Sequence, residues 1–396
     1  MAATPMNLKL FLLRLLAARL ATYRQGPARP ELERARLARQ RIALVKLDGI
    51  GDFALVTGLL QLIRQELPGA EVTYFCRQPV GELVRQQFPE WSVMEVFNLR
   101  STSKEILLDQ NLRRRLKSLP PFDLLLDLRT FRNFDEIAVV SWIPARQKIA
   151  LKNARPTEGH WWSGPREERI YDRLLPLPDY SRLTGVRDLQ NHAGLADYIF
   201  SNPPASPPRL TIRPEEQQNL IRRLTPDVDA PFLLVCPGAG AAFREYPAGE
   251  LAKAVAAAVA GSSLKIVIAG GKQDTRSTNA FAEALNQTGI EAVNLTGTLN
   301  LAEHTTLMSL AKAVVCMETS HAHMAGALGC PAVVIIGGGH YGLFGPWGES
   351  PTFRWLTHRV PCFGCNWTCI HDRPLCIQDI PVETIAQNLA EVLSLS

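Results

Sequence analysis

Short apolar runs alternate with helix-forming segments along most of this chain, and this alternation limits the folds open to it more than any other feature. Runs that are apolar throughout, such as 313–317, are typical of strands buried on both faces. Such strands joined by helices predict parallel, doubly wound sheets in an α/β fold. The predicted strands are Arg41–Leu47, Glu71–Cys76, Phe122–Asp127, Lys148–Leu151, Pro231–Cys236, Leu264–Ala269, Ala292–Leu295, Ala313–Met317 and Ala332–Ile336.

Five prolines between positions 203 and 214 separate two α/β series and predict a domain boundary. The irregular composition of 153–181 predicts a functional loop over a cleft. In doubly wound sheets ligands bind at the carboxyl ends of the strands, so two facing Rossmann-like domains would hold a ligand between them. We predict a helical arm over 1–40, a first domain over 41–205, a linker region over 206–230 and a second domain over 231–396, which includes a cysteine-rich loop over 361–377.

Basic residues are concentrated at the N-terminus. Residues 1–41 hold nine Lys and Arg against two Glu, whereas the whole chain has a net charge of only +5. A nucleic-acid-binding protein spreads its basic residues over a folded face, so nucleic acid is not an expected partner. The longest uncharged stretch, 319–348, contains three histidines and many glycines, which argues against a membrane-spanning helix.

The leucine-rich segment 8–20 of the arm favours a helix. Its basic residues Lys9, Arg14 and Arg19 recur every five positions and therefore scatter around the helix. Two interpretations remain open: a helix packed on the protein's own surface or on a partner subunit, and an arm attracted to an anionic membrane surface. Because basic residues interrupt the apolar segment, we do not expect a cleavable signal peptide.

The first predicted strand is followed by a glycine-containing loop. Gly49 and Gly51 allow a tight turn, and Lys46 and Asp48 flank it. Asp52 falls in the first turn of the following helix, where aspartate is a common helix cap. The same carboxylate is also a candidate general base, and the two roles are compatible.

The loop over 236–247 follows the first strand of the second series. Its small residues Gly238, Ala239 and Gly240 expose backbone N–H groups, and Arg244 supplies a positive charge before a helix. This combination favours an anionic ligand such as a phosphate. The loop lacks the Lys-Ser/Thr ending of a P-loop and the spacing of a dinucleotide fingerprint, so ATP hydrolysis and NAD chemistry are not expected.

The loop over 317–323 precedes another helix. Thr319 and Ser320 favour a phosphate at the helix N-terminus, whereas Glu318 is expected to contact hydroxyl groups or loop amides. His321 and His323 are two positions apart on the predicted helix, so they do not share a face or a metal ion.

Together these loops resemble glycosyltransferase family 9, the bacterial ADP-heptose:lipopolysaccharide heptosyltransferases. Segment 47–52 is similar to the family's Leu-x-x-Ile-Gly-Asp pattern, and 237–247 to its Pro-Gly-Ala … Lys/Arg-x-Trp-Pro segment, with Tyr246 in place of Trp. Segment 318–329 and the later Gly-Pro-Trp-Gly at 345–348 also fit, with Glu318 in place of Asp and Ser320 in place of Gly. The resemblance covers about 41–380 and excludes the arm.

The resemblance implies a GT-B fold with the acceptor in the first domain and the nucleotide-sugar in the second. It implies inverting transfer of a heptose from ADP-heptose to a lipopolysaccharide core, without a catalytic metal. Asp52 is then the base, and Lys46, Asp48, Gly49 and Gly51 form the acceptor-side loop. The implied donor-binding residues are Gly238, Ala239, Gly240, Arg244, Glu318, Thr319, Ser320 and His323. The implied location is cytoplasmic, peripheral on the inner membrane if the arm binds anionic lipid.

Cysteines cluster near the C-terminus as Cys362, Cys365, Cys369 and Cys376. Four thiols in a short loop suit a tetrahedral structural site for zinc or iron, although reduced thiols or disulfides formed on purification are alternatives. Similar clusters occur in some family members, and protein-modifying heptosyltransferases include an iron-binding version. Two further functions therefore stay open: O-heptosylation of an autotransporter by an oligomeric enzyme, and a non-catalytic module that binds nucleotide-sugar or metal.

Overall fold

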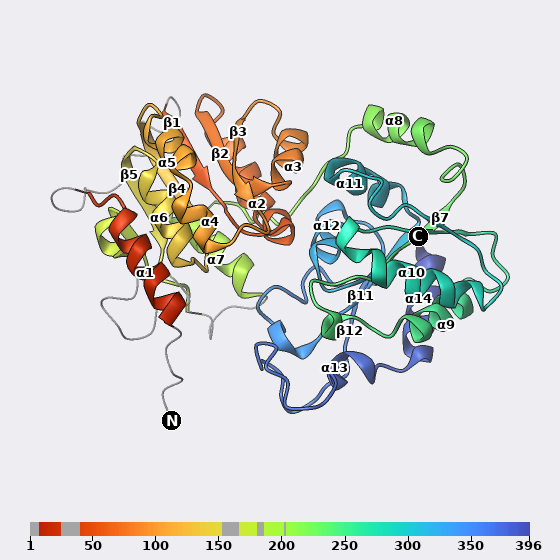
Figure 1. Cartoon of the computed structure of the whole chain (residues 1–396). Helices are drawn as coiled ribbons and strands as arrows, with labels where there is room; N and C mark the ends of the chain where they lie inside the picture. The colour runs from red at the N-terminus through yellow and green to blue at the C-terminus, as the bar shows by residue number, and fades with distance from the viewer. Residues whose placement is uncertain (1–7, 25–39, 153–165, 180–185, 202) are drawn as a thin grey trace. The chain divides into compact units, whose positions relative to one another are not determined.

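The computed structural model describes residues 8–24, 40–152, 166–179, 186–201 and 203–396. Contacts divide the chain into two compact units, and each contains one six-stranded parallel sheet (Figure 1). The first unit comprises Met1–Gly49, Leu59–Arg182 and Gln190–Ser206, and the second comprises Ile50–Gly58, Leu183–Leu189 and Pro207–Ser396.

The first sheet has the strand order β3-β2-β1-β4-β5-β6, with all neighbours parallel. Its strands are β1 (Arg41–Val45), β2 (Glu71–Gln78), β3 (Ser92–Asn98), β4 (Phe122–Asp127), β5 (Ala145–Leu151) and β6 (Arg173–Leu175). The associated helices are α1 (Leu8–Leu20), α2 (Ile50–Glu66), α3 (Val80–Gln87), α4 (Ser103–Leu108), α5 (Gln110–Lys117), α6 (Phe134–Trp142) and α7 (Arg187–Phe200). The chain order reverses between β1 and β4, which is the position where doubly wound sheets bind ligands.

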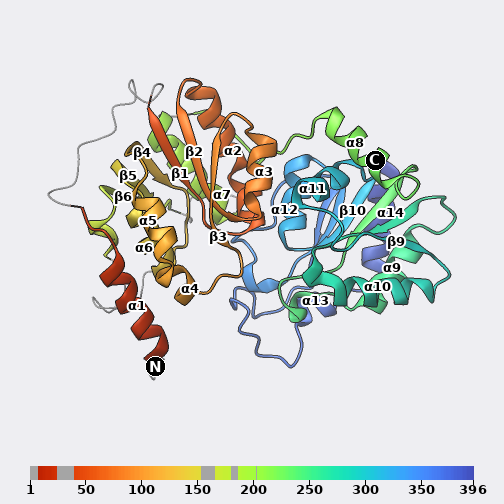
Figure 2. The same cartoon turned by 45° about the horizontal axis from the view of Figure 1, so that its top comes forward.

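The second sheet repeats this topology as β12-β11-β10-β7-β8-β9. Its strands are β7 (Phe232–Cys236), β8 (Lys265–Ile268), β9 (Ala292–Asn294), β10 (Ala313–Met317), β11 (Ala332–Ile335) and β12 (Phe353–Leu356). Its helices are α8 (Pro214–Leu224), α9 (Ala248–Ala258), α10 (Thr275–Asn286), α11 (Leu301–Leu310), α12 (Ser320–Leu328), α13 (Leu375–Gln378) and α14 (Val382–Leu395). Figure 2 shows α9, α10 and α14 on one side of this sheet and α11 and α12 on the other. The reversal lies between β7 and β10.

Strands β7 and β10 are buried at every position, and this explains why continuous apolar runs predicted them. Val235, Val315 and Met317 pack in one core cluster with Phe281 of α10 and Leu389 of α14. The predicted α/β fold class with two doubly wound series is therefore confirmed.

Helix α1 packs on the first unit, beside α6 (Figures 1 and 2). Ala17 is buried in the core cluster of this unit, and Trp142 donates its indole N–H to the Leu20 carbonyl oxygen at 2.9 Å. Leu12, by contrast, is 55% exposed. The helix thus covers the protein's own surface with one side, as the first interpretation of the arm expects. Among the described residues, no helix is long and apolar enough to cross a membrane.

Two sequence predictions need correction. The stretch 153–181, predicted as irregular, contains β6 and a 3₁₀ turn at Glu167–Arg169, while 153–165 and 180–181 lie outside the described residues. The loop after β1 is shorter than predicted, because α2 already begins at Ile50. Both Gly51 and Asp52 therefore lie within the first turn of that helix.

Candidate active site

The two predicted donor-side loops follow β7 and β10, which are neighbouring strands of the second sheet. The loop after β7 carries Arg244 on a 3₁₀ turn at Ala242–Arg244, and the loop after β10 carries Glu318. Because parallel strands end at the same edge of a sheet, these residues meet although 74 positions separate them in sequence.

Arg244 and Glu318 form an ion pair at the centre of this edge. The Arg244 Nη2 atom lies 2.7 Å from Oε2 of Glu318 and donates to the Glu318 backbone carbonyl oxygen at 2.7 Å. Burial alone raises the pKa of Glu318, but His323 and Arg244 outweigh burial and hold its pKa below the ordinary value. The carboxylate is therefore ionised. It compensates the positive charge of Arg244, which the sequence pattern predicted to bind a phosphate. The Nε of Arg244 is buried without a hydrogen-bond partner.

His323 completes this group of residues from α12. Its Nε2 atom lies 3.6 Å from Oε1 of Glu318, and its Nδ1 atom lies 3.1 Å from the indole nitrogen of Trp347. An indole nitrogen can only donate, so Nδ1 of His323 accepts and the ring proton resides on Nε2, facing Glu318. A Cβ at Gly326 would lie 2.7 Å from the Trp347 ring, so a glycine is needed there for the tryptophan to approach α12. Trp347 belongs to a predicted motif, but its hydrogen bond to His323 was not predicted from sequence.

Two of the other predicted donor-side residues already use a hydrogen-bonding group within the protein. The Ala239 N–H already donates to Glu245 at 3.3 Å. The Thr319 hydroxyl caps α12 by accepting from the His321 N–H, and it also lies 3.0 Å from Nδ1 of His321. Ser320 begins α12. The hydroxyl of Thr319 and the amide of Ala239 thus serve the loops themselves, which the sequence pattern did not reveal.

The space available for a side chain differs between Gly238 and Gly240. A Cβ at Gly238 would lie 2.8–2.9 Å from three atoms of the buried Asp274 side chain, whereas a Cβ at Gly240 meets no atom within 4 Å. Asp274 in turn accepts a hydrogen bond from the Gly271 N–H at 2.8 Å. Only Gly238 is therefore required by packing.

We expect Gly238→Ala to destabilise the protein by about 1–3 kcal/mol, because the added methyl group displaces a buried, hydrogen-bonded side chain. Gly240→Ala is the matched control and should leave the free energy of unfolding within about 0.5 kcal/mol of the wild type. Urea denaturation of both variants checks this. Equal stabilities of the two variants would contradict the described packing of the loop.

In the loop after β1, Lys46 is 2% exposed and its Nζ atom lies 2.9 Å from Oδ2 of Asp48. Gly49 directly precedes α2. Contacts assign the start of α2 to the second unit, where a Cβ at Gly51 would lie 2.8 Å from Cδ2 of His323. The turn that carries Asp52 therefore approaches α12 so closely that residue 51 cannot bear a side chain without displacing His323.

A buried charged network that sequence analysis missed lies after β4. Asp127 and Arg129 are fully buried and paired at 2.6 Å, and Nη1 of Arg129 lies 3.1 Å from Oε2 of Glu136. Arg77 of β2 also pairs with Glu136, and its Nε donates to the Leu47 carbonyl oxygen. The network thus fixes the loop after β1 from the neighbouring strands. The charged residues Asp127 and Arg129 at the end of an apolar run were the available sequence signal.

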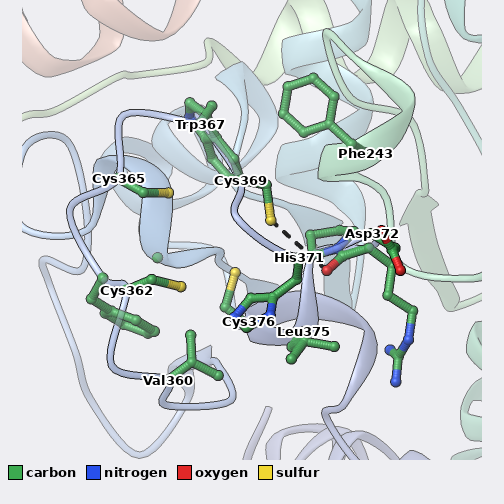
Figure 3. A pocket seen from close by; sticks show the side chains of 14 residues that line it. Phe243, Val360, Cys362, Cys365, Trp367, Cys369, His371, Asp372, Leu375 and Cys376 are labelled. Carbon is green, nitrogen blue, oxygen red and sulfur yellow. Dashed lines mark hydrogen bonds between the residues drawn. The ribbon is translucent and has the colours of Figure 1, made fainter.

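The four clustered cysteines line one cavity of about 80 Å³ (Figure 3). All are free thiols, and Cys376 is buried whereas Cys369 is exposed. His371 and Asp372 line the same cavity. A set of four thiols around one small space fits a soft or borderline metal ion in chemical type.

The cysteine-rich loop also contacts the donor-side residues through Trp367. The guanidinium carbon of Arg244 lies 4.8 Å from the centre of the Trp367 ring, a cation–π contact. Cβ atoms at Gly337 and Gly339 would lie 2.6 and 2.4 Å from the same indole, so these glycines let the tryptophan pack close to the backbone after β11. The cysteine-rich loop thus contacts the same guanidinium that pairs with Glu318.

The family model of glycosyltransferase family 9 (heptosyltransferase) matches residues 187–370. That range contains Arg244, Glu318, His323 and most of the cysteine-rich loop. This part of the chain belongs to glycosyltransferase family 9. The resemblance carried by the loop motifs is therefore confirmed, and the matches indicate that the chain is a glycosyltransferase. No curated protein sequence matches the chain.

Solved structures share the fold of this chain over about nine tenths of its length. The glycosyltransferase family 9 protein from Veillonella parvula DSM 2008 is 16% identical with a TM-score of 0.68, covering 91% of this chain and 99% of that one. For E. coli ADP-heptose LPS heptosyltransferase II the values are 16%, 0.65, 90% and 99%. For the iron-containing dodecameric glycosyltransferase TibC from enterotoxigenic E. coli H10407 they are 14%, 0.50, 94% and 82%. At these identities the likeness shows the fold, and it confirms the predicted GT-B class.

Proposed function

We propose that this family 9 glycosyltransferase transfers a heptose from ADP-heptose to a lipopolysaccharide core acceptor with inversion. The observation that carries the proposal is the Arg244–Glu318–His323 group at the strand-order reversal of the second sheet, inside the region that matches the heptosyltransferase family model. The similar E. coli heptosyltransferase II is named for ADP-heptose and LPS.

In this mechanism an acceptor hydroxyl attacks the anomeric carbon and ADP leaves. Asp52 removes the proton of the attacking hydroxyl. Its carboxylate lies in the first turn of α2 beside Gly51, where an added Cβ would lie 2.8 Å from Cδ2 of His323. The unpartnered Nε–H of Arg244 and the backbone N–H groups of Gly238, Gly240 and Ser320 stabilise the charge of the departing diphosphate. The ionised Glu318 keeps Arg244 oriented and holds the Nε2–H of His323.

Transfer to a deacylated core oligosaccharide, compared with an autotransporter fragment, tests the acceptor. Mass spectrometry with ADP-heptose as donor should show one added heptose on the core oligosaccharide. Heptose on the fragment alone would contradict the lipopolysaccharide assignment and favour protein O-heptosylation. Donor binding without turnover on either acceptor would contradict catalysis and favour a binding module.

Protein O-heptosylation is the second candidate because of the cysteine-rich loop. The similar TibC is described as iron-containing and dodecameric, and the four thiols of this chain line one cavity. An oligomeric enzyme holding a structural metal at this loop is consistent with both features. The acceptor comparison separates this candidate from the first.

For the loop itself we expect about one equivalent of zinc or iron per chain after anaerobic purification, held by Cys362, Cys365, Cys369 and Cys376. A Cys362→Ser/Cys365→Ser variant should contain one equivalent less, while Cys330→Ser, which alters a buried thiol elsewhere, should not change the content. Elemental analysis measures both. Less than about a tenth of an equivalent in the wild type would contradict the site.

A peripheral location on an anionic membrane is also part of the proposal. Leu10, Leu12 and Leu15 of α1 are exposed, and Lys9, Arg14 and Arg19 lie on the same short helix. Exposed leucines beside basic residues suit binding at a lipid surface. This would hold a cytoplasmic enzyme close to a lipid-linked acceptor.

A further inference from the structure

Cys236, His304 and His321 form a compact group inside the second unit, separate from the cysteine-rich loop. Their ligand atoms all lie within 4.8 Å of one another, and all three side chains are buried. They come from three elements: Cys236 ends β7, His304 lies on α11 and His321 lies on α12. The two imidazole rings are 4.9 Å apart between centres.

The hydrogen bonding of this group is incomplete. His304 is only 6% exposed, and its Nε2 atom is buried without a hydrogen-bond partner. A buried imidazole nitrogen without a partner costs free energy unless another group satisfies it. In His321, by contrast, Nδ1 lies 3.0 Å from the hydroxyl oxygen of Thr319. The remaining ring nitrogen of His321, Nε2, is therefore the one that can bind a metal ion.

We propose that Cys236, His304 and His321 bind a structural zinc ion. One thiolate and two imidazoles are ligands that zinc prefers, and three of them leave one coordination position for a water molecule or a further group. The Thr319 contact supplies the outer hydrogen bond that usually orients a metal-binding histidine. On binding, Zn²⁺ replaces the thiol proton of Cys236, which is released to solvent.

Burial prepares the two imidazoles for this role. It lowers the pKa of His304 to about 4, and burial followed by the neighbouring His304 lowers the pKa of His321 to about 3. Both rings are therefore neutral near pH 7, and each has one nitrogen whose lone pair is free to bind a metal ion. Burial raises the pKa of Cys236, so the thiol stays protonated near pH 7 until a metal ion binds the sulfur and the proton is released to solvent.

The ion has a defined structural consequence. It joins the end of β7, where the Arg244 loop starts, to α12, which carries His323. The zinc would thus fix the two loops of the donor site relative to each other from inside the unit. This inference concerns the core of the unit and does not depend on which sugar or acceptor the enzyme uses.

The test measures zinc that resists chelation in the folded, full-length chain. Protein from zinc-supplemented cells is dialysed against EDTA, which removes metal from the partly exposed cysteine-rich loop, and is then unfolded in guanidinium chloride. We expect one zinc per chain to remain after dialysis and to be released on unfolding. Zinc K-edge absorption of the dialysed wild type should show mixed nitrogen and sulfur ligation.

His304→Leu and Cys236→Ala should each retain no zinc after dialysis, whereas Cys330→Ala should retain one. Cys330 is the matched control because it is also a buried thiol of the second unit. Its S–H donates a hydrogen bond to the Met308 carbonyl oxygen. No retained zinc in the wild type, retention in all three variants, or ligation by sulfur alone would overturn the proposal. The absorption measurement needs no variant and decides the matter even if the variants do not fold.

Discussion

Replacing Asp52 with alanine is expected to lower kcat for heptosyl transfer by about 10²–10⁴-fold and to leave the donor Kd within about threefold of the wild type. The acceptor hydroxyl loses its base, whereas donor binding relies on the loops after β7 and β10. Steady-state kinetics with ADP-heptose and core oligosaccharide, together with calorimetric titration of the donor, measure the two effects separately.

Asp52→Asn is the control for a role of Asp52 in the helix alone. Asp52 lies in the first turn of α2, where a carboxylate stabilises the helix by up to about 1 kcal/mol. Asparagine keeps the shape and removes the base, so kcat should fall as in the alanine variant while thermal stability changes little. Normal turnover with slightly lower stability would assign Asp52 to the helix and remove it from the chemistry.

Arg244→Ala is expected to raise the donor KM by about 30-fold, which corresponds to about 2 kcal/mol for one lost charge-assisted hydrogen bond. The effect should appear mainly in KM because the guanidinium holds the diphosphate, whereas Asp52 acts on the acceptor. The substitution also leaves the buried carboxylate of Glu318 without its cation, so a lower Tm is expected as well.

Arg276→Ala provides the comparison for this prediction. Arg276 pairs with Glu245 of the same loop at 2.7 Å, but its side chain is 67% exposed. An exposed pair of this kind contributes little, so the donor KM should stay within about twofold. Equal effects of the two variants would mean that general loop charge, and not the position of Arg244, determines donor binding.

The central strands were predictable because burial on both faces leaves an unmistakable apolar run, as in β10. Three strands were missed, and all lie toward the edges of their sheets. β3 is only partly buried, β6 is three residues long, and β12 alternates between buried and partly exposed positions. Such segments carry a weak apolar signal, and their pairing partners decide their structure.

The candidate site was predictable as a set of loops and not as a set of contacts. Strand-to-helix junctions identified both loops from sequence, one by its glycines Gly238 and Gly240 and the other by Thr319 and Ser320 beside Glu318. The ion pair of Glu318 with Arg244 and the contact of Arg244 with Trp367 depend on strand order, which the local pattern does not contain. For the same reason His304 gave no signal, since its partners come from two other elements.

Photolabelling with 8-azido-ADP, followed by peptide mapping, tests most directly whether the second sheet holds the nucleotide-sugar. We predict labelled peptides from 237–247, 318–329 or 337–348, and we predict that ADP-heptose competes with the label. Label confined to 59–152, or label that ADP-heptose does not displace, would contradict it.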